Sequence, residues 1–263
     1  MQSEKMKLTF LGTRGSVPVA GKEYETYGGA TSCIRVLADK EEIYLDAGSG
    51  IVRAIPEEDT NLTILLSHLH LDHVQGLSFF PALTQADRPI IIYAEPRSGL
   101  SAQETIDRLF APPIWPIMIS DYSADVTFLP LPETLSLGEV QVSAMGSCHP
   151  GGSTIYRLTY GGASFVYATD FEHVEAKVKE LIAFSEGADL LIYDGQYAEA
   201  EYERQKGYGH STASVGARIA SAAHVKKLVI THHDPGHDDS WFARMEKEYP
   251  QIAFAKDREE IIL

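Results

Sequence analysis

Short apolar runs alternate with amphipathic segments along the chain. The apolar runs have the length and the β-branched and aromatic content of strands, and they occupy 8–12, 32–38, 41–48, 62–68, 89–94, 125–131, 139–147, 153–170, 188–194 and 226–232. The run 153–170 predicts a hairpin that turns through Gly161-Gly162. Apolar residues at helical spacing predict helices over 98–110, 173–186, 211–223 and 240–248. This succession of strands and helices indicates an α/β fold.

The two halves of the chain share one arrangement. Each half holds β-rich sequence and then a strand-helix-strand unit whose apolar strand ends in Asp or His. These strand ends are Leu45-Asp46, Ser67-His68, Thr169-Asp170 and Thr231-His232. In α/β folds ligands bind at the carboxyl ends of strands, because the loops there converge on one crevice. We therefore expect one site, built from strand ends, in a single domain that covers residues 1–263.

The composition is that of an ordinary globular protein. The chain has 263 residues, of which 44% are hydrophobic and 22% are charged. No apolar stretch approaches the ~20 residues that cross a bilayer, and the start MQSEKMKLTF lacks the apolar segment of a signal peptide. A cytoplasmic location without membrane contact is therefore expected. Cys33 and Cys148 lie far apart and resemble neither a disulfide framework nor a cysteine metal site.

The charge excludes one class of partner. The chain has 22 basic and 37 acidic residues, a formal net charge of −15, and no run of Lys or Arg. Proteins that hold long nucleic acids neutralise phosphates with such basic residues. A long nucleic acid is therefore not expected as the partner.

The strongest chemical signal is SHLHLDH at 67–73. His68 and His70 alternate along an extended segment and can face the same ion, whereas Asp72 and His73 lie on the turn into the next helix and can face a second ion. A set of unrelated surface residues would not place four strong metal ligands in six positions. The cluster therefore predicts a metal site.

A catalytic zinc ion takes three protein ligands and keeps a position for water, so further ligands must come from elsewhere. Candidates at later strand ends are His149 in SCHPGG, Asp170 in YATD and His232 in ITHHDP. Asp170 has two carboxylate oxygens and is suited to bridge two ions. His233 and His237 compete with His232, which is preferred because it follows Thr231 at the strand end.

The pattern HxHxDH, followed by isolated His, Asp and His, resembles the metallo-β-lactamase-fold hydrolases over essentially the whole chain. The resemblance implies an αβ/βα four-layer sandwich, with two sheets packed face to face and helices outside. It also implies two divalent metal ions, held by His68, His70 and His149, by Asp72, His73 and His232, and by Asp170 as the bridge. The chain has His70 where di-iron redox members carry Glu, which favours hydrolysis. It has Asp170 where the zinc β-lactamases carry Cys, which argues against lactam substrates.

A second resemblance is narrower. The stretches LTFLGTRGSVP, LDAGSG, LLIYDGQY and GHSTASVGARIA are similar to those of the transfer-RNA 3′-processing endonucleases (tRNase Z) and their small phosphodiesterase relatives. This implies that His210 is the acid for the leaving group, that Asp194 orients it, and that Asp72 belongs to the catalytic set. The family usually reads HEA where this chain reads Tyr193-Asp194-Gly195.

Simpler interpretations of this second motif stay open. His210 could merely precede a helix that Ser211 or Thr212 caps, and Asp194 could be an ordinary strand-end carboxylate. Asp46 is a candidate to hydrogen-bond a ligand histidine, although a turn before Gly48 would also explain it.

The sequence therefore predicts a dinuclear metal hydrolase. Two ions would supply hydroxide and neutralise phosphate oxygens; zinc is expected, with manganese or iron as alternatives that the same nitrogen and oxygen ligands suit. The leading hypothesis is a phosphodiesterase for small substrates, such as cyclic nucleotides or ribosyl cyclic phosphates. In tRNase Z, a long insertion between the third histidine and the bridging aspartate grips the RNA, whereas one hairpin fills that interval here.

Other functions remain as alternatives: a thioesterase or lactonase of the same fold, a tRNase Z-like ribonuclease, or a scaffold without catalysis. The expected partner is a small phosphodiester, and a homodimer is compatible with the sequence.

Overall fold

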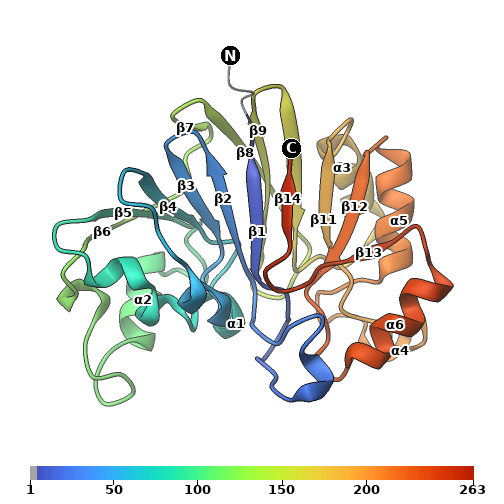
Figure 1. The fold of residues 1–263 in the computed structure, drawn as a ribbon, viewed down its shortest axis with the longest axis horizontal. Coiled ribbons are helices and arrows are strands. Elements are labelled where there is room, and N and C mark those ends of the chain that lie inside the picture. Colours follow the sequence, from blue (N-terminus) through green and yellow to red (C-terminus); the bar gives the residue numbers. More distant parts are fainter. Residues whose placement is uncertain (1–4) are drawn as a thin grey trace.

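The computed structural model describes residues 5–263. Within them, two seven-stranded sheets pack face to face, and helices cover their outer faces (Figure 1). The first sheet has the order β14-β1-β2-β3-β4-β5-β6, and the second has the order β13-β12-β11-β10-β9-β8-β7. The predicted αβ/βα four-layer sandwich is confirmed.

Most of the first sheet comes from the first half of the chain. Its strands are β1 (Lys7–Gly12), β2 (Cys33–Ala38), β3 (Glu41–Leu45), β4 (Asn61–Leu65), β5 (Pro89–Tyr93), β6 (Asp125–Leu129) and β14 (Glu260–Ile262). The strands of the second sheet are β7 (Leu135–Leu137), β8 (Val140–Gly146), β9 (Thr154–Tyr160), β10 (Ala163–Ala168), β11 (Leu190–Asp194), β12 (Lys227–Thr231) and β13 (Ala253–Phe254). The helices are α1 (Leu71–Val74), α2 (Ala102–Leu109), α3 (Glu175–Phe184), α4 (Glu199–Gln205), α5 (Ala213–Ala222) and α6 (Asp239–Glu248).

The central strands of the second sheet, such as β10 and β11, are apolar on both faces because both faces are buried. Val229 of β12 points into the core between the two sheets, and its neighbour Ile230 points into the core under the helices of the second sheet. A third apolar core lies between the first sheet and α2. This double burial explains why the sequence shows near-continuous apolar runs rather than strict alternation.

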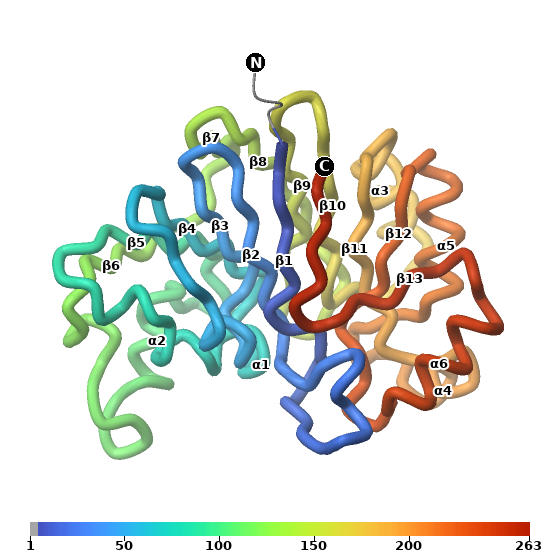
Figure 2. Tube along the Cα trace, in the orientation of Figure 1, coloured from blue at the N-terminus to red at the C-terminus, as the bar shows by residue number. Residues whose placement is uncertain are grey.

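Parallel strand pairs bring the polar strand ends to one edge. Strands β3, β4, β5 and β6 are parallel, as are β10, β11, β12 and β13. In Figure 1 their carboxyl ends lie at the lower edge, next to α1. The loop between β1 and β2 and the segment between α2 and β6 project from this same edge (Figure 2). The fold thus places the loops that carry the motifs on one side of the molecule.

The sequence predicted the principal strands and four of the helices, with local differences. The expected helix 98–110 begins later, because Ser101 caps α2 through a capping box with Glu104. The expected hairpin turns at Gly161-Gly162, which both have positive φ, as predicted. The short strands β7, β13 and β14 and the short helices α1 and α4 were not predicted.

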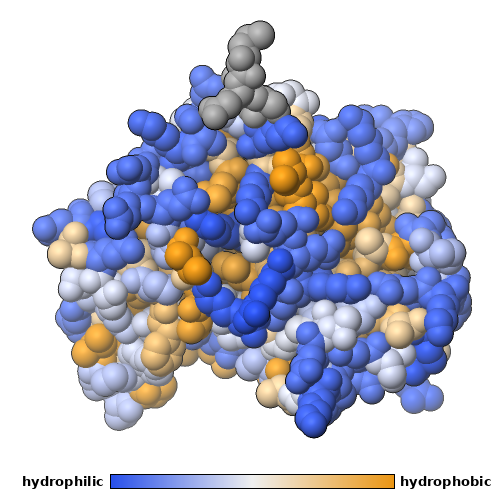
Figure 3. All heavy atoms as spheres, in the orientation of Figure 1, coloured by the Kyte–Doolittle hydropathy of each residue, from blue (hydrophilic) through white to orange (hydrophobic). Residues whose placement is uncertain are grey.

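The face in view in Figure 3 is mostly hydrophilic. Hydrophobic residues show at its lower left, over the segment between α2 and β6, where Ile114 is 73% exposed. Among residues 5–263, no helix combines the length and the apolar character that are needed to cross a bilayer.

Candidate metal centre

The strand-end loops bring the seven predicted ligand residues together. Six of them form two triads. The first triad is His68, His70 and His149, and the second is Asp72, His73 and His232. In each triad, the candidate ligand atoms of the three residues lie within 4.8 Å of one another. These are the same two groups that the resemblance implied. His68 and His70 lie in the loop after β4, Asp72 and His73 lie in α1, and the other three residues follow β8, β10 and β12.

Asp170 lies between the two triads. Its Oδ1 is 3.6 Å from His68 Nε2 and 3.6 Å from His149 Nε2. Its Oδ2 is 3.2 Å from His73 Nε2 and 3.5 Å from His232 Nε2. Each carboxylate oxygen therefore faces a different triad, which is the arrangement that a bridging ligand needs.

Four of the histidines share one orientation. Each donates its Nδ1–H to an oxygen behind it: His68 to Ser67 Oγ (3.0 Å), His73 to Asp46 Oδ2 (2.8 Å), His149 to the carbonyl of Gly209 (3.0 Å) and His232 to Gln196 Oε1 (3.0 Å). Such partners fix the tautomer of a metal-binding imidazole and leave Nε2 as the ligand atom. In all four, Nε2 faces the centre of the cluster.

The inward nitrogens lie close to one another at the centre of the cluster. His68 Nε2 is buried and has no hydrogen bond within residues 5–263. His73 Nε2 lies 3.2 Å from His232 Nε2, and His149 Nε2 lies 3.0 Å from His70 Nδ1. Because His73 and His232 both carry a proton on Nδ1, their two Nε2 atoms can lie this close only with a further proton or a metal ion between them. The geometry and the nitrogen and oxygen ligand set fit divalent metal ions.

The pKa shifts within the cluster also favour a bound cation. Burial lowers the pKa of His68 well below its usual value. Burial also disfavours the charged form of His73 and His232, but the nearby carboxylates, led by Asp170, outweigh it. They raise the pKa of His73 well above its usual value and that of His232 to about 9. Burial raises the pKa of Asp170, yet the surrounding imidazoles, led by His232, hold it well below its usual value. The Asp170 carboxylate is thus ionised, and a bound metal ion would neutralise it.

Asp46 supports this centre from behind. Its Oδ2 accepts from His73 Nδ1, from the hydroxyl of Tyr167 (2.9 Å) and from Ser67 Oγ (2.9 Å). Its Oδ1 accepts from the amide of Ser67 (2.7 Å). Asp46, Asp170 and His232 all have positive φ, so backbone strain gathers at the strand ends that build the site.

The loop after β1 covers the second triad. A Cβ on Gly15 would lie 2.3 Å from His232 Nδ1, so only glycine allows this approach. The amide of Ser16 then donates to Asp72 Oδ2 (2.7 Å). The motif LGTRGSVP therefore positions two of the predicted ligands. The sequence analysis assigned no glycine to the site, because a glycine after a strand usually marks a turn.

His210 and Asp194 lie directly beside the cluster. His210 Nδ1 donates to Asp194 Oδ2 at 2.8 Å, and both residues are buried. The His210 ring lies 5.1 Å from the ring of His149 and 4.8 Å from that of His232, centroid to centroid. The alternative that the motif merely caps a helix is not supported, because Thr212 is the N-cap of α5 and makes no side-chain capping bond.

Two supporting residues were missed by the sequence analysis. Gln196 accepts from His232, as described above. Glu172 accepts from the amides of Gly207 (2.7 Å) and Gly209 (3.0 Å) and so holds the loop that carries His210. Both lie two residues beyond a strand-end aspartate, a position that could have drawn attention to them.

The structure separates His232 from its two rivals. His233 Nε2 donates to the carbonyl of Ala255 (2.8 Å), away from the cluster. His237 stacks on Trp241 with ring centroids 3.7 Å apart. Neither belongs to a group that could hold an ion among the described residues.

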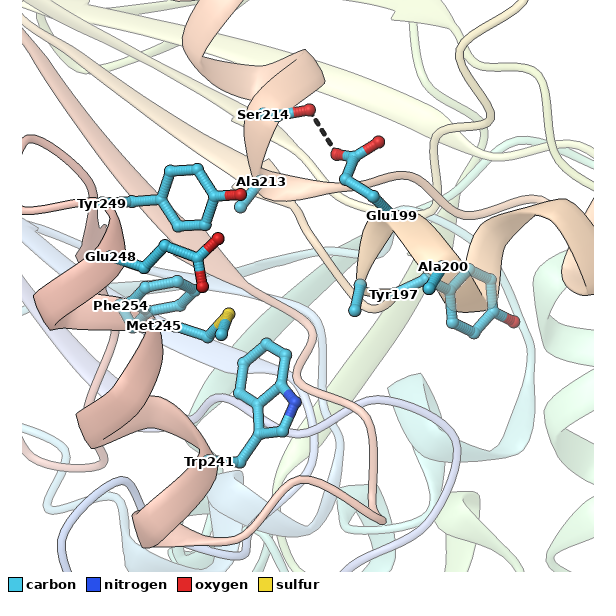
Figure 4. Close-up of a pocket in the computed structure, with 11 residues that line it drawn as sticks. Tyr197, Glu199, Ala200, Ala213, Ser214, Trp241, Met245, Glu248, Tyr249 and Phe254 are labelled. Atoms are coloured by element: carbon cyan, nitrogen blue, oxygen red, sulfur yellow. Dashed lines mark hydrogen bonds between the residues drawn. The ribbon is translucent and has the colours of Figure 1, made fainter.

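A separate cavity of about 240 Å³ lies behind Tyr197 and does not include any of the predicted ligands. Trp241, Met245 and Glu248 line one wall, and Glu199 faces them from the start of α4 (Figure 4). It is a surface cavity beside the centre rather than part of it.

Comparison with known proteins agrees with this geometry. A family profile described as "Beta-lactamase superfamily domain" matches residues 42–233, which is most of the chain. The chain belongs to the β-lactamase superfamily. Its fold is the metallo-β-lactamase fold, and it falls in the tRNase Z-like branch. With the clusters described above, it is a metal-dependent hydrolase of that fold.

The individual relatives have low sequence identity to this chain. Ribonuclease Z of Haloarcula marismortui is 27% identical over 287 positions, which cover 86% of each chain. The metallo-β-lactamase fold protein YhfI from Bacillus subtilis superimposes with a TM-score of 0.75 at 21% identity, over 99% of this chain and 100% of YhfI. A diphosphatase from the PhnP family gives a TM-score of 0.69 at 19% identity, over 97% of each chain. The two solved structures are similar in fold.

Proposed function

We propose that the protein is a phosphodiesterase that hydrolyses small phosphodiesters at a dinuclear metal centre. His68, His70 and His149 would hold one ion, Asp72, His73 and His232 the other, and Asp170 would bridge them. When bound, the ions supply hydroxide and neutralise phosphate oxygens. The ligand set suits zinc, and manganese or iron are alternatives.

The buried pair of His210 and Asp194 is the observation that favours phosphodiesters over thioesters and lactones. An alkoxide leaves a phosphodiester poorly unless it is protonated, whereas a thiolate leaves a thioester without help. Asp194 Oδ2 accepts from His210 Nδ1 at 2.8 Å and so orients the ring, and the opposite ring nitrogen, Nε2, makes no hydrogen bond within residues 5–263 and would carry the proton to the leaving oxygen. A thioesterase or a lactonase would gain less from this pair.

The size of the substrate follows from what lies around the centre. The interval between His149 and Asp170 holds only β9, the two-glycine turn and β10, with no room for an RNA-binding arm. The net charge of −15 repels a long polyanion outside the metal pocket. The ribonuclease alignment is 287 positions long although it covers only 86% of this 263-residue chain, so the ribonuclease has stretches without a counterpart here. These observations favour a small diester over transfer RNA.

The names of the sequence relatives make a tRNase Z-like ribonuclease the second candidate. We expect the metal-loaded protein to cleave cyclic nucleotides or small aryl phosphodiesters and to leave a precursor transfer RNA intact, at matched concentration and physiological salt. Thioesters and lactones belong in the same panel. Cleavage of the transfer RNA at one site, with the small diesters untouched, would contradict the proposal, as would a preference for thioesters.

A further inference from the structure

A second pocket opens beside His68 and His70 of the first histidine triad. Its volume is about 200 Å³, and it is lined by His68, Leu69, His70, Arg97, Ser98, Leu100, Thr105, Gly151 and Gly152. It lies between the start of α2 and the loop after β8. Apolar side chains form part of its wall, and Arg97 is its only cationic side chain other than the histidines.

Arg97 is held close to the predicted metal ligands. Its Nη2 donates to Thr154 Oγ1 (2.8 Å) and lies 3.4 Å from the carbonyl of Ser67, the residue before His68. Its Nη1 lies over Gly152, 2.3 Å from where a Cβ would be, and Gly152 has a φ of +80°, a conformation that favours glycine. The adjacent Gly151 lies next to His70, and a Cβ there would be in ordinary contact with His70 Nε2, at 3.7 Å. The guanidinium and His70 thus flank one glycine pair.

The charge on Arg97 is not neutralised by the protein. No carboxylate lies within 4.0 Å of its guanidinium among residues 5–263, its Nη1 makes no hydrogen bond with them, and its buried Nε has no partner. Burial lowers the pKa of Arg97, against smaller opposing effects of Tyr156 and Glu95. A guanidinium remains charged in proteins even so. Arg97 is thus a half-buried cation without an ion pair, next to the candidate metal centre. Such a side chain is suited to bind an anionic group of a ligand.

The two sides of the centre would receive different parts of a diester. His210, the proposed acid, would contact the leaving oxygen, and it does not line this pocket. The retained arm of the substrate therefore has the pocket at His70 available to it. An apolar wall with one cation at its end fits a short cyclic or aromatic group that carries a negative charge.

We propose that Arg97 selects diesters whose retained arm bears a second anionic group, a carboxylate or a phosphate. This rests on the proposed phosphodiesterase function and narrows its substrate class. Arg97 acts as a specificity residue, because it binds the distal charge and does not touch the reacting bond.

The test uses two esters that differ only at the distal group: 4-nitrophenyl 4-carboxyphenyl phosphate and its neutral counterpart, 4-nitrophenyl 4-carbamoylphenyl phosphate. The full-length, metal-loaded protein should prefer the carboxylate ester. In Arg97→Met, kcat/KM for the carboxylate ester should fall on the order of 10- to 100-fold, because a charge-assisted contact is lost, while the carbamoyl ester changes little. Arg97→Lys should keep part of the preference.

Thr154→Val is the matched control, because it removes the hydroxyl that Arg97 Nη2 contacts and leaves the charge in place. Thr154→Val should leave the ratio of kcat/KM for the two esters unchanged. If Arg97 had a purely structural role, Arg97→Met would lower kcat/KM for both esters together. A wild-type protein with no preference, or a ratio that survives Arg97→Met, would overturn the inference. If the wild type cleaves neither ester, the proposed function fails, and the ratio of dissociation constants for the same intact esters decides the role of Arg97.

Discussion

Asp170→Asn is expected to remove bound metal and hydrolytic activity together. The carboxylate places one oxygen toward each histidine triad, 3.2–3.6 Å from four Nε2 atoms, so an amide would leave at least one ion without its shared anionic ligand. Asparagine is preferable to alanine here, because Asp170 has a φ of 52° and asparagine tolerates this conformation. The loss of activity should exceed the 10- to 100-fold that removal of an outer hydrogen-bond partner costs. Metal content per chain and diesterase rate are measured on the same sample.

Asp189→Asn is the matched control for this substitution. Asp189 lies just before β11, at the opposite end of the strand from the cluster, and its partners are Lys226 and the amide of Ser164. It should keep both metal and activity. Two metal ions per chain retained in Asp170→Asn would contradict the bridging assignment.

His210→Ala is expected to separate metal binding from catalysis. His210 would protonate the leaving group rather than hold an ion, so both ions should stay bound. Hydrolysis of diesters with alkyl or nucleoside leaving groups should slow on the order of 10²–10⁴-fold, and 4-nitrophenyl esters much less, because nitrophenolate leaves without protonation. The comparison of kcat on the two substrate types is the measurement.

Two further variants complete this comparison. Asp194→Asn should act in the same direction as His210→Ala, because Asp194 Oδ2 accepts from His210 Nδ1. His224→Asn replaces an exposed histidine that follows α5 and should change neither substrate. An equal loss on both substrate types in His210→Ala would show that this residue is not the acid.

Much of the fold was readable from the sequence, since the long strands are buried on both faces and appear as apolar runs. The short elements were not readable for a physical reason. β13 and β14 have two and three residues, and their pairing with β12 and β1 depends on contacts far along the chain. The start of α2 was placed too early, because Leu100 is apolar and was taken into the helix, whereas the capping box at Ser101 sets the boundary.

The positions of the candidate ligands were also readable, because each ends a strand or lies in the turn that follows one. The choice between His232 and His233 illustrates the remaining difficulty. The two neighbouring side chains point in different directions, so only one of the pair faces the cluster, and the sequence alone does not fix which. In the structure His232 contacts Gln196 and the cluster, and His233 points toward Ala255.

The residues that support the ligands were mostly not readable. Gln196, Glu172 and Arg97 act through partners on other loops, and their roles depend on which loops the two sheets bring together. Asp46 was considered from the sequence because it ends an apolar strand, and its bond to His73 agrees with that expectation. A local pattern thus identifies the strand ends but not the contacts between them.

The most direct test of the dinuclear phosphodiesterase is a metal titration of activity. Metal-depleted protein is titrated with zinc or manganese while hydrolysis of bis(4-nitrophenyl) phosphate is followed. The two triads and the bridging carboxylate predict that the rate rises until two equivalents per chain are bound and then stays constant. Full activity at one equivalent, or no diesterase activity at any metal concentration, would contradict the account.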